Sequence, residues 1–278
     1  MGFKTVFYLT GIGTGNDDAL HVARICRDLD AHLMVLVAGL SVPPPTSPYG
    51  VIGNEHWAEE ISQGQQEVKA RADELKAELS DKVPGLVVEA QFVDRATLPT
   101  LAARFARYAD LTLIPPARDE TSVFHGCTVD GALFESGRPV LLLPGDDTVF
   151  PNIKKVMVAW DASVEASKAV RDGIGIMKRA EATDIVLIDP VPSFDGHGPE
   201  PGSDLARYLN RHGISATVHC IPRQGRETGD ALLATARDLG SELIIMGGFG
   251  HSRLRQRIFG GTTTNMLKNA DLPIFMAH

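Results

Sequence analysis

Cysteine is scarce in this chain, whose 278 residues include only Cys26, Cys127 and Cys220. An odd number of cysteines at wide spacing excludes the disulfide framework of a small secreted protein and the paired cysteines of a structural zinc site. Proteins without disulfides are typical of a reducing compartment. We therefore expect a cytoplasmic protein, and we assign no side chain as a metal ligand.

Long apolar runs and an excess of basic charge are also missing. No run reaches the roughly 18 apolar residues that cross a bilayer, and residues 1–6 lead into a strand-like segment rather than a signal peptide. The formal net charge is −8, which argues against a general nucleic-acid surface. A hydrophobic content of 44% is typical of a globular protein. The sequence predicts a soluble protein with neither a membrane nor a nucleic acid as its partner.

The sequence contains an internal repeat. An offset of 150 residues superposes Val6 on Val156 and Ala19 on Ala169 without a gap, and strand-like and helix-like segments alternate in both halves. The strand-like segments are apolar on both faces, as in a parallel sheet covered by helices. We predict an α/β protein of two tandem, Rossmann-like, doubly wound parallel-sheet domains. They span residues 1–147 and 152–278, with an acidic, proline-bounded linker between them.

Each half has its own connecting segments. The first half carries a proline-rich loop at residues 41–49 and then a long charged helix over 54–81. In the second half, Ser203 is predicted to cap a helix that ends at Arg211.

A glycine-rich segment near the end of the chain is the strongest local motif. The apolar run 243–246 is followed by Gly247 and Gly250, then by a basic loop, then by Gly260 and Gly261 with threonines where a helix should begin. Glycines let backbone N–H groups approach an anion, and a helix N-terminus adds its positive dipole end. The pattern is typical of a phosphate cradle, but a turn followed by a solvated basic loop is the alternative.

Two further strands of the second half end in residues suited to ligand binding. Asp161 follows the first strand, where its carboxylate could accept a hydrogen bond from an adenine amino group or a ribose hydroxyl; an ordinary turn acid is the alternative. Gly225 follows a middle strand and permits close backbone approach. Ligands of open parallel sheets bind at the carboxyl ends of the strands.

Together, the repeated α/β unit, Asp161, Gly225 and the spacing Gly247-x2-Gly250-x9-Gly260 resemble the universal stress protein family in its tandem form. The resemblance implies an adenine nucleotide (ATP, ADP or AMP, with Mg²⁺) in the second half, a homodimer, pairing of the last strands of the two halves (140–143 and 274–277), and an unidentified protein partner. It places the acid and Ile188 at adenine and ribose, and the glycine loop at the phosphates. The full set of candidate binding residues is Asp161, Ala162, Ile188, Gly225, Met246, Gly247, Gly250, His251, Arg253, Gly260, Gly261, Thr262 and Thr263.

One position departs from the family pattern. Gly261 stands where a serine or threonine is expected next to Gly260, and the hydroxyls begin at Thr262. Gly261 can still offer its N–H to a phosphate. The basic residues of the loop either neutralise phosphate charge or face solvent.

The first half has lost this pattern. Gly11 occupies the position of Asp161, and Pro115 and Pro116 stand where the second half has Gly247 and Gly248. Proline has no N–H to donate to a phosphate. We therefore predict one nucleotide per chain.

Other functions are less well supported by the sequence. The glycines that follow residue 10 lack the third glycine of a dinucleotide fingerprint, and His251-Ser252 lacks the elbow motif of a hydrolase. No catalytic residue is assigned. The leading hypothesis is a stress-response protein that acts through ligand-dependent interaction; the alternatives are a slow ATPase using the same loop and a scaffold that binds no nucleotide or another small metabolite.

Overall fold

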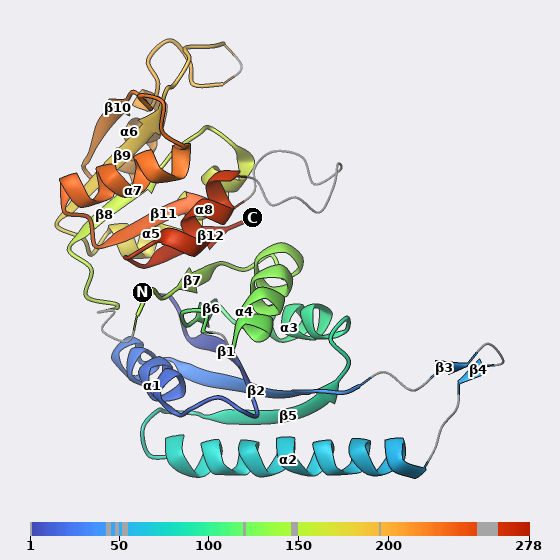
Figure 1. Ribbon diagram of the computed structural model, residues 1–278. Helices are drawn as coiled ribbons and strands as arrows, with labels where there is room; N and C mark the ends of the chain where they lie inside the picture. Colours follow the sequence, from blue (N-terminus) through green and yellow to red (C-terminus); the bar gives the residue numbers. More distant parts are fainter. Residues whose placement is uncertain are drawn as a thin grey trace. The chain divides into compact units, whose positions relative to one another are not determined.

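The computed structural model describes residues 2–42, 46–47, 50–51, 55–118, 121–145, 150–194, 196–248 and 261–278. The chain divides into two compact units (Figure 1). One is Phe3–Arg138, and the other is Pro139–His278 together with Gly2. The functional domain boundaries expected from the sequence, 1–147 and 152–278, stay a prediction.

The N-terminal unit is a parallel sheet with helices packed on it. Its strands are β1 (Thr5–Gly11), β2 (His32–Leu40), β5 (Val87–Val93) and β6 (Leu111–Ile114), in the order β6-β1-β2-β5. Its helices are α1 (Asp17–Leu29), α2 (Glu55–Leu79), α3 (Leu98–Ala106) and α4 (Ser122–Thr128), which continues into the π-helical turn η1 (Val129–Leu133). Two antiparallel strands of two residues each, β3 (Thr46–Ser47) and β4 (Gly50–Val51), precede α2.

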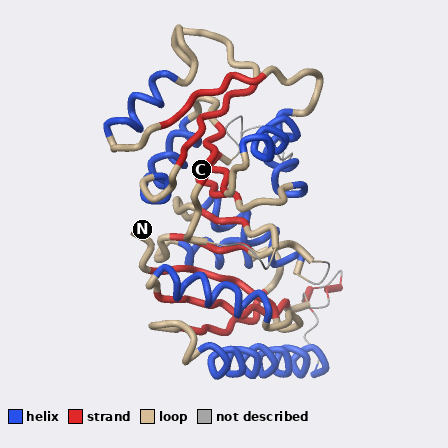
Figure 2. Tube along the Cα trace, turned by 90° about the vertical axis from the view of Figure 1, so that its left-hand side faces the viewer, coloured by secondary structure: helices blue, strands red, loops and turns tan. Residues whose placement is uncertain are grey.

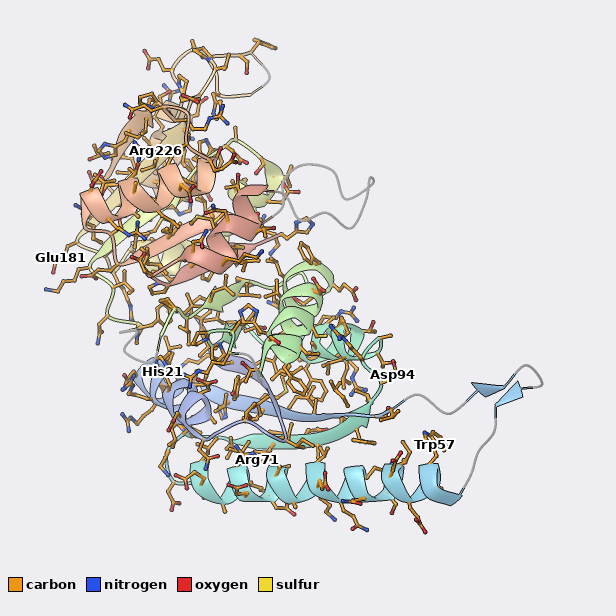
Figure 3. The ribbon with its side chains drawn as sticks, viewed as in Figure 1. His21, Trp57, Arg71, Asp94, Glu181 and Arg226 are labelled. Carbon is orange, nitrogen blue, oxygen red and sulfur yellow. The ribbon has the colours of Figure 1, made fainter. Side chains whose placement is uncertain are left out.

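The long helix α2 forms where the charged pattern predicts it. It packs against β2 and β5 (Figure 2) and buries Val68, Leu75 and Leu79 from its apolar stripe. Arg71 lies between α2 and the sheet (Figure 3), where its Nη2 donates a hydrogen bond to the carbonyl oxygen of Thr14 at 2.7 Å.

The C-terminal unit repeats the same arrangement. Its strands are β7 (Val140–Leu142), β8 (Lys155–Ala159), β9 (Ala182–Ile188), β10 (Ala216–Ile221), β11 (Leu243–Gly247) and β12 (Ile274–Ala277). They lie in the order β10-β9-β8-β11-β12-β7 and are parallel except for β7. Its helices are α5 (Val164–Met177), α6 (Ser203–Arg211), α7 (Thr228–Leu239) and α8 (Gly261–Asn269).

The central strands are buried on both faces because helices cover both sides of the sheet. Val156, Val158 and Leu243 to Ile245 are fully buried. Helix α5 packs on β8, β11 and β12, whereas α7 packs against β9 and α8. Right-handed crossovers place α5 and α7 on opposite faces of the sheet. The reason is that the chain first winds from β8 toward β10 and then returns to β11, which lies on the other side of β8.

The two units share one strand order. The order β5-β2-β1-β6 in the first corresponds to β10-β9-β8-β11 in the second, which confirms the predicted tandem, doubly wound α/β fold. The pairing expected of the last strands is present: β7 runs antiparallel to β12 and places Leu141 opposite Phe275. In the described ranges, no helix combines the length and apolar character needed to span a membrane.

One predicted cap was wrong. Helix α6 begins at Ser203 as the first helical residue, and its N-cap is Gly202, with φ +86° and no capping side chain. A left-handed backbone at the cap favours glycine over serine there.

Candidate functional site

A cleft of about 340 Å³ opens at the carboxyl edge of the sheet in the C-terminal unit. It lies where the strand order reverses, at β8, with β9 on one side and β11 on the other. Open α/β sheets bind their ligands at such a switch point. The strands and the two residues that follow β8 contribute Ala159, Trp160, Asp161, Val186, Ile188, Met246 and Gly247; the helices and one loop contribute Thr228, Leu232, Gly261, Thr262, Thr263 and His197.

Strand register explains the floor of the cleft. Ala159 pairs with Val186 of β9 and with Met246 of β11, so these three side chains lie in one row on one face of the sheet. Ile188 follows Val186 by two residues on β9, so strand alternation places it on the same face, and Asp161, two residues beyond the end of β8, also lines the cleft. The row gives an apolar floor with one carboxylate at its outer edge.

Asp161 has two structural roles at once. Its Oδ1 accepts a hydrogen bond from the N–H of Ser163 at 3.0 Å, and Ser163 in turn caps α5 by accepting from the N–H of Ala166 at 3.1 Å. Ala162, between them, has a left-handed φ of 61°. The carboxylate therefore shapes the turn, as the alternative interpretation expected, and also lines the cleft.

The first turn of α8 forms the opposite wall. Gly261, Thr262 and Thr263 line the cleft at the helix N-terminus, and the first turn of α8 carries no acidic residue. Asn265 fixes this helix to α7, because its Nδ2 donates to Oδ1 of Asp230 at 2.9 Å. N–H groups and the dipole at a helix N-terminus favour a bound anion.

Gly247 is required by packing. A Cβ at this position would lie 2.5 Å from the backbone nitrogen of Ala166, in the first turn of α5. The backbone of Gly247 lines the cleft, but the missing side chain would point to the other face of the sheet, toward α5.

Several predicted site residues lie elsewhere. Gly225 occupies a turn after β10, next to Arg226 (Figure 3), where its φ of +78° favours glycine; it does not line the cleft. Ala162 is not among the lining residues either. Gly250, His251, Arg253 and Gly260 lie outside the described residues.

Sequence reasoning did not identify several lining residues. Val186 and Ala159 could have been found by stepping back two residues from Ile188 and Asp161. Leu232 and Thr228 belong to the face of α7 that covers this end of the sheet. Helical periodicity identifies the residues of that face, but it does not show which of them line a cleft and which pack in the core. His197 comes from a loop whose sequence carries no motif.

The equivalent cleft in the N-terminal unit is closed. Only about 20 Å³ remains there, at the carboxyl ends of β1 and β6. The ring of Phe124 lies directly against Gly11, the counterpart of Asp161, and any Cβ at Gly11 would clash with it. Burial in this closed region raises the pKa of Tyr8 above its usual range and lowers the pKa of His125.

The cleft contains little that could hold a metal alone. Among the described residues, no group of three or more His, Cys, Asp or Glu side chains could hold a metal ion. Magnesium commonly binds through one or two carboxylates together with the phosphates of a ligand. Asp161 is the one acidic side chain among the described residues of the lining, so the donor set fits Mg²⁺ only as an ion held mainly by phosphates.

Comparisons with known proteins agree with this architecture. The model of the universal stress protein family matches residues 152–278. A universal stress protein of Synechocystis sp. is 25% identical over 164 residues, which cover 56% of this chain and 54% of that protein, so the match spans about half the length of this relative.

Solved structures are similar over the whole chain. The crystal structure of a universal stress protein from Archaeoglobus fulgidus has a TM-score of 0.66 and 18% identity, covering 100% of this chain and 99% of that one. A structure from Pseudomonas aeruginosa UCBPP-PA14 has a TM-score of 0.58 and 14% identity, covering 99% and 93%. At these identities the likeness establishes the fold.

Proposed function

We propose that the C-terminal unit, whose residues 152–278 match the model of the universal stress protein family, binds one adenine nucleotide in the cleft at the ends of β8, β9 and β11. The ligand is ATP, ADP or AMP, and Mg²⁺ accompanies the phosphates. The protein acts in the cytoplasm, as a homodimer, by presenting a ligand-dependent surface to a protein partner.

One observation carries the proposal. A cleft of about 340 Å³ joins an apolar floor to the N-terminus of α8, whereas only about 20 Å³ remains at the same position of the first repeat. Small-molecule sites are concave, mostly apolar and furnished with a few polar groups, within a volume range that begins at about 300 Å³. The C-terminal cleft meets this description, and its closed counterpart does not.

The roles of the lining residues follow from their positions. Phosphates lie at the first turn of α8, where Thr262 and Thr263 supply hydroxyls and the backbone of Gly261 supplies an N–H. The carboxylate of Asp161 accepts a hydrogen bond from a ribose hydroxyl or the adenine amino group through the oxygen that Ser163 leaves available. Met246 and Ile188 contact the apolar faces of the nucleoside.

Calorimetric titration of the purified chain with ATP and Mg²⁺ tests the proposal. We expect a stoichiometry of one nucleotide per chain, because Phe124 fills the N-terminal counterpart of the cleft. Phosphate release is measured in the same samples. Turnover would favour the slow ATPase, absence of binding would leave a scaffold or a binder of another metabolite, and two nucleotides per chain would contradict the asymmetry of the repeats.

Gly261→Ser is expected to tighten ATP binding about fivefold. A Cβ at Gly261 would meet nothing within 4 Å, so a serine hydroxyl has room at the start of α8. One additional hydrogen bond to a phosphate contributes about 1 kcal/mol. The dissociation constants of the two proteins are compared by calorimetry.

The matched variant is Gly261→Ala, which adds the Cβ without the hydroxyl. We expect its affinity for ATP to stay close to that of the unchanged protein. Equal tightening by both variants would attribute the gain to helix propensity instead of a hydroxyl contact.

A further inference from the structure

His197 lies on the loop between β9 and α6 and lines the cleft. A tight turn fixes its position: the N–H of Gly198 donates to the carbonyl oxygen of Ser193 at 2.9 Å, and the two residues form a β-bridge. At Gly196, a Cβ would lie 2.5 Å from Oγ of Ser193, so the turn is closely packed. The imidazole is therefore presented at the cleft by a folded segment.

The Nδ1 atom of His197 is buried, yet it makes no hydrogen bond to any residue that the structure describes. Leaving a buried polar atom unpaired costs about 1–3 kcal/mol. If the imidazole turns about its Cβ–Cγ bond so that Nδ1 faces the cleft, a ligand group that pairs with this atom would remove the cost on binding. The neutral imidazole can donate or accept, so it suits a hydroxyl or a ring nitrogen.

The position of His197 indicates which part of a ligand it meets. Its loop follows β9, whereas the anion-binding turn of α8 comes after β11, and β8 lies between these two strands in the sheet. If the phosphates occupy the α8 end, the opposite end of the cleft is left for the nucleoside.

We propose that His197 determines specificity for the nucleoside part of the ligand, through a hydrogen bond from or to Nδ1. This inference rests on the proposed nucleotide site and assigns the residue that distinguishes a nucleotide from a bare polyphosphate. The loop sequence carries no binding motif, and the assignment comes from its geometry alone.

The test compares ATP with inorganic tripolyphosphate as ligands of the full chain. His197→Ala is expected to weaken ATP binding about tenfold, because one hydrogen bond is lost and its partner stays unpaired. Tripolyphosphate binding is expected to be unchanged. His197→Asn, whose amide occupies the position of Nδ1, should recover part of the affinity for ATP; His197→Gln, whose amide lies farther out, should recover less.

A histidine outside the cleft serves as the control. The ring of His212 lies at the end of α6 against Tyr208, at 4.7 Å between centroids, and His212→Ala should leave both ligands unaffected. Equal weakening of ATP and tripolyphosphate by His197→Ala, or an unchanged affinity for ATP, would overturn the inference while the nucleotide site stands. Failure of the unchanged protein to bind ATP would overturn both.

A spectroscopic measurement tests the contact between His197 and ATP directly, without a comparison of ligand affinities. In protein labelled with ¹⁵N-histidine, ATP is expected to shift the Nδ1 resonance of His197, because that nitrogen gains a hydrogen-bond partner. An Nδ1 resonance that stays in place at saturating ATP contradicts the proposed contact.

Discussion

Gly247→Ala is expected to lower the free energy of unfolding by about 1–3 kcal/mol, the usual range for forcing a carbon into a packed site. The new Cβ would lie 2.5 Å from the backbone nitrogen of Ala166 and 2.7 Å from the carbonyl carbon of Glu165. Backbone atoms cannot rotate aside, so β11 and α5 must move apart. Urea unfolding measures the loss.

The matched control is Gly126→Ala in α4. A Cβ there would meet nothing within 4 Å, so the variant should be as stable as the unchanged protein or slightly more stable. The comparison also separates two explanations for Gly247. A variant that stays stable but no longer binds ATP would mean that the glycine serves the ligand, as the phosphate-cradle interpretation holds, and not the contact with α5.

The second large effect concerns the cleft itself. Ala159→Trp is expected to weaken ATP binding on the order of 100-fold or more, because the indole would fill a cleft that must enclose most of the ligand. Ala159 lies in the row formed with Val186 and Met246, at the centre of the floor. The change imitates the first repeat, in which an aromatic ring already fills the equivalent space.

Loss of affinity must be separated from loss of folding. Because the added side chain occupies an open cleft of about 340 Å³, the unfolding midpoint should change little. Val87→Trp provides the control, since Val87 is exposed on β5 in the N-terminal unit and should leave ATP binding intact. Normal ATP affinity in a folded Ala159→Trp protein would show that the nucleotide binds elsewhere.

Much of the fold could be predicted from local pattern. A tandem, doubly wound sheet could be predicted from three features of the sequence: strands that are apolar on both faces, the 150-residue offset between repeats, and glycines at the ends of strands. Asp161, Ile188 and Met246 were also within reach, because residues at the carboxyl ends of neighbouring parallel strands converge. These features follow from local sequence pattern and from the sheet topology, and the internal repeat predicts that topology.

What could not be predicted depends on contacts between distant segments. From the sequence, glycine at residue 247 is explained by ligand binding. In the structure it is required because a side chain there would clash with α5. Phe124 reads as an ordinary apolar residue of a helix, and its position over Gly11 emerges only from tertiary packing. His197 depends on the path of a loop that no periodicity constrains.

The antiparallel pairing of β7 with β12 has a consequence for assembly. A strand that belongs to the first repeat by sequence completes the sheet edge of the second, and an open edge is a template for association with other chains. If β7 and β12 belonged to two separate molecules, the fraction of paired strands would depend on the protein concentration. Here both strands are covalently joined, and intramolecular closure replaces a bimolecular encounter. Dilution therefore leaves this pairing intact, and expression level need not control it.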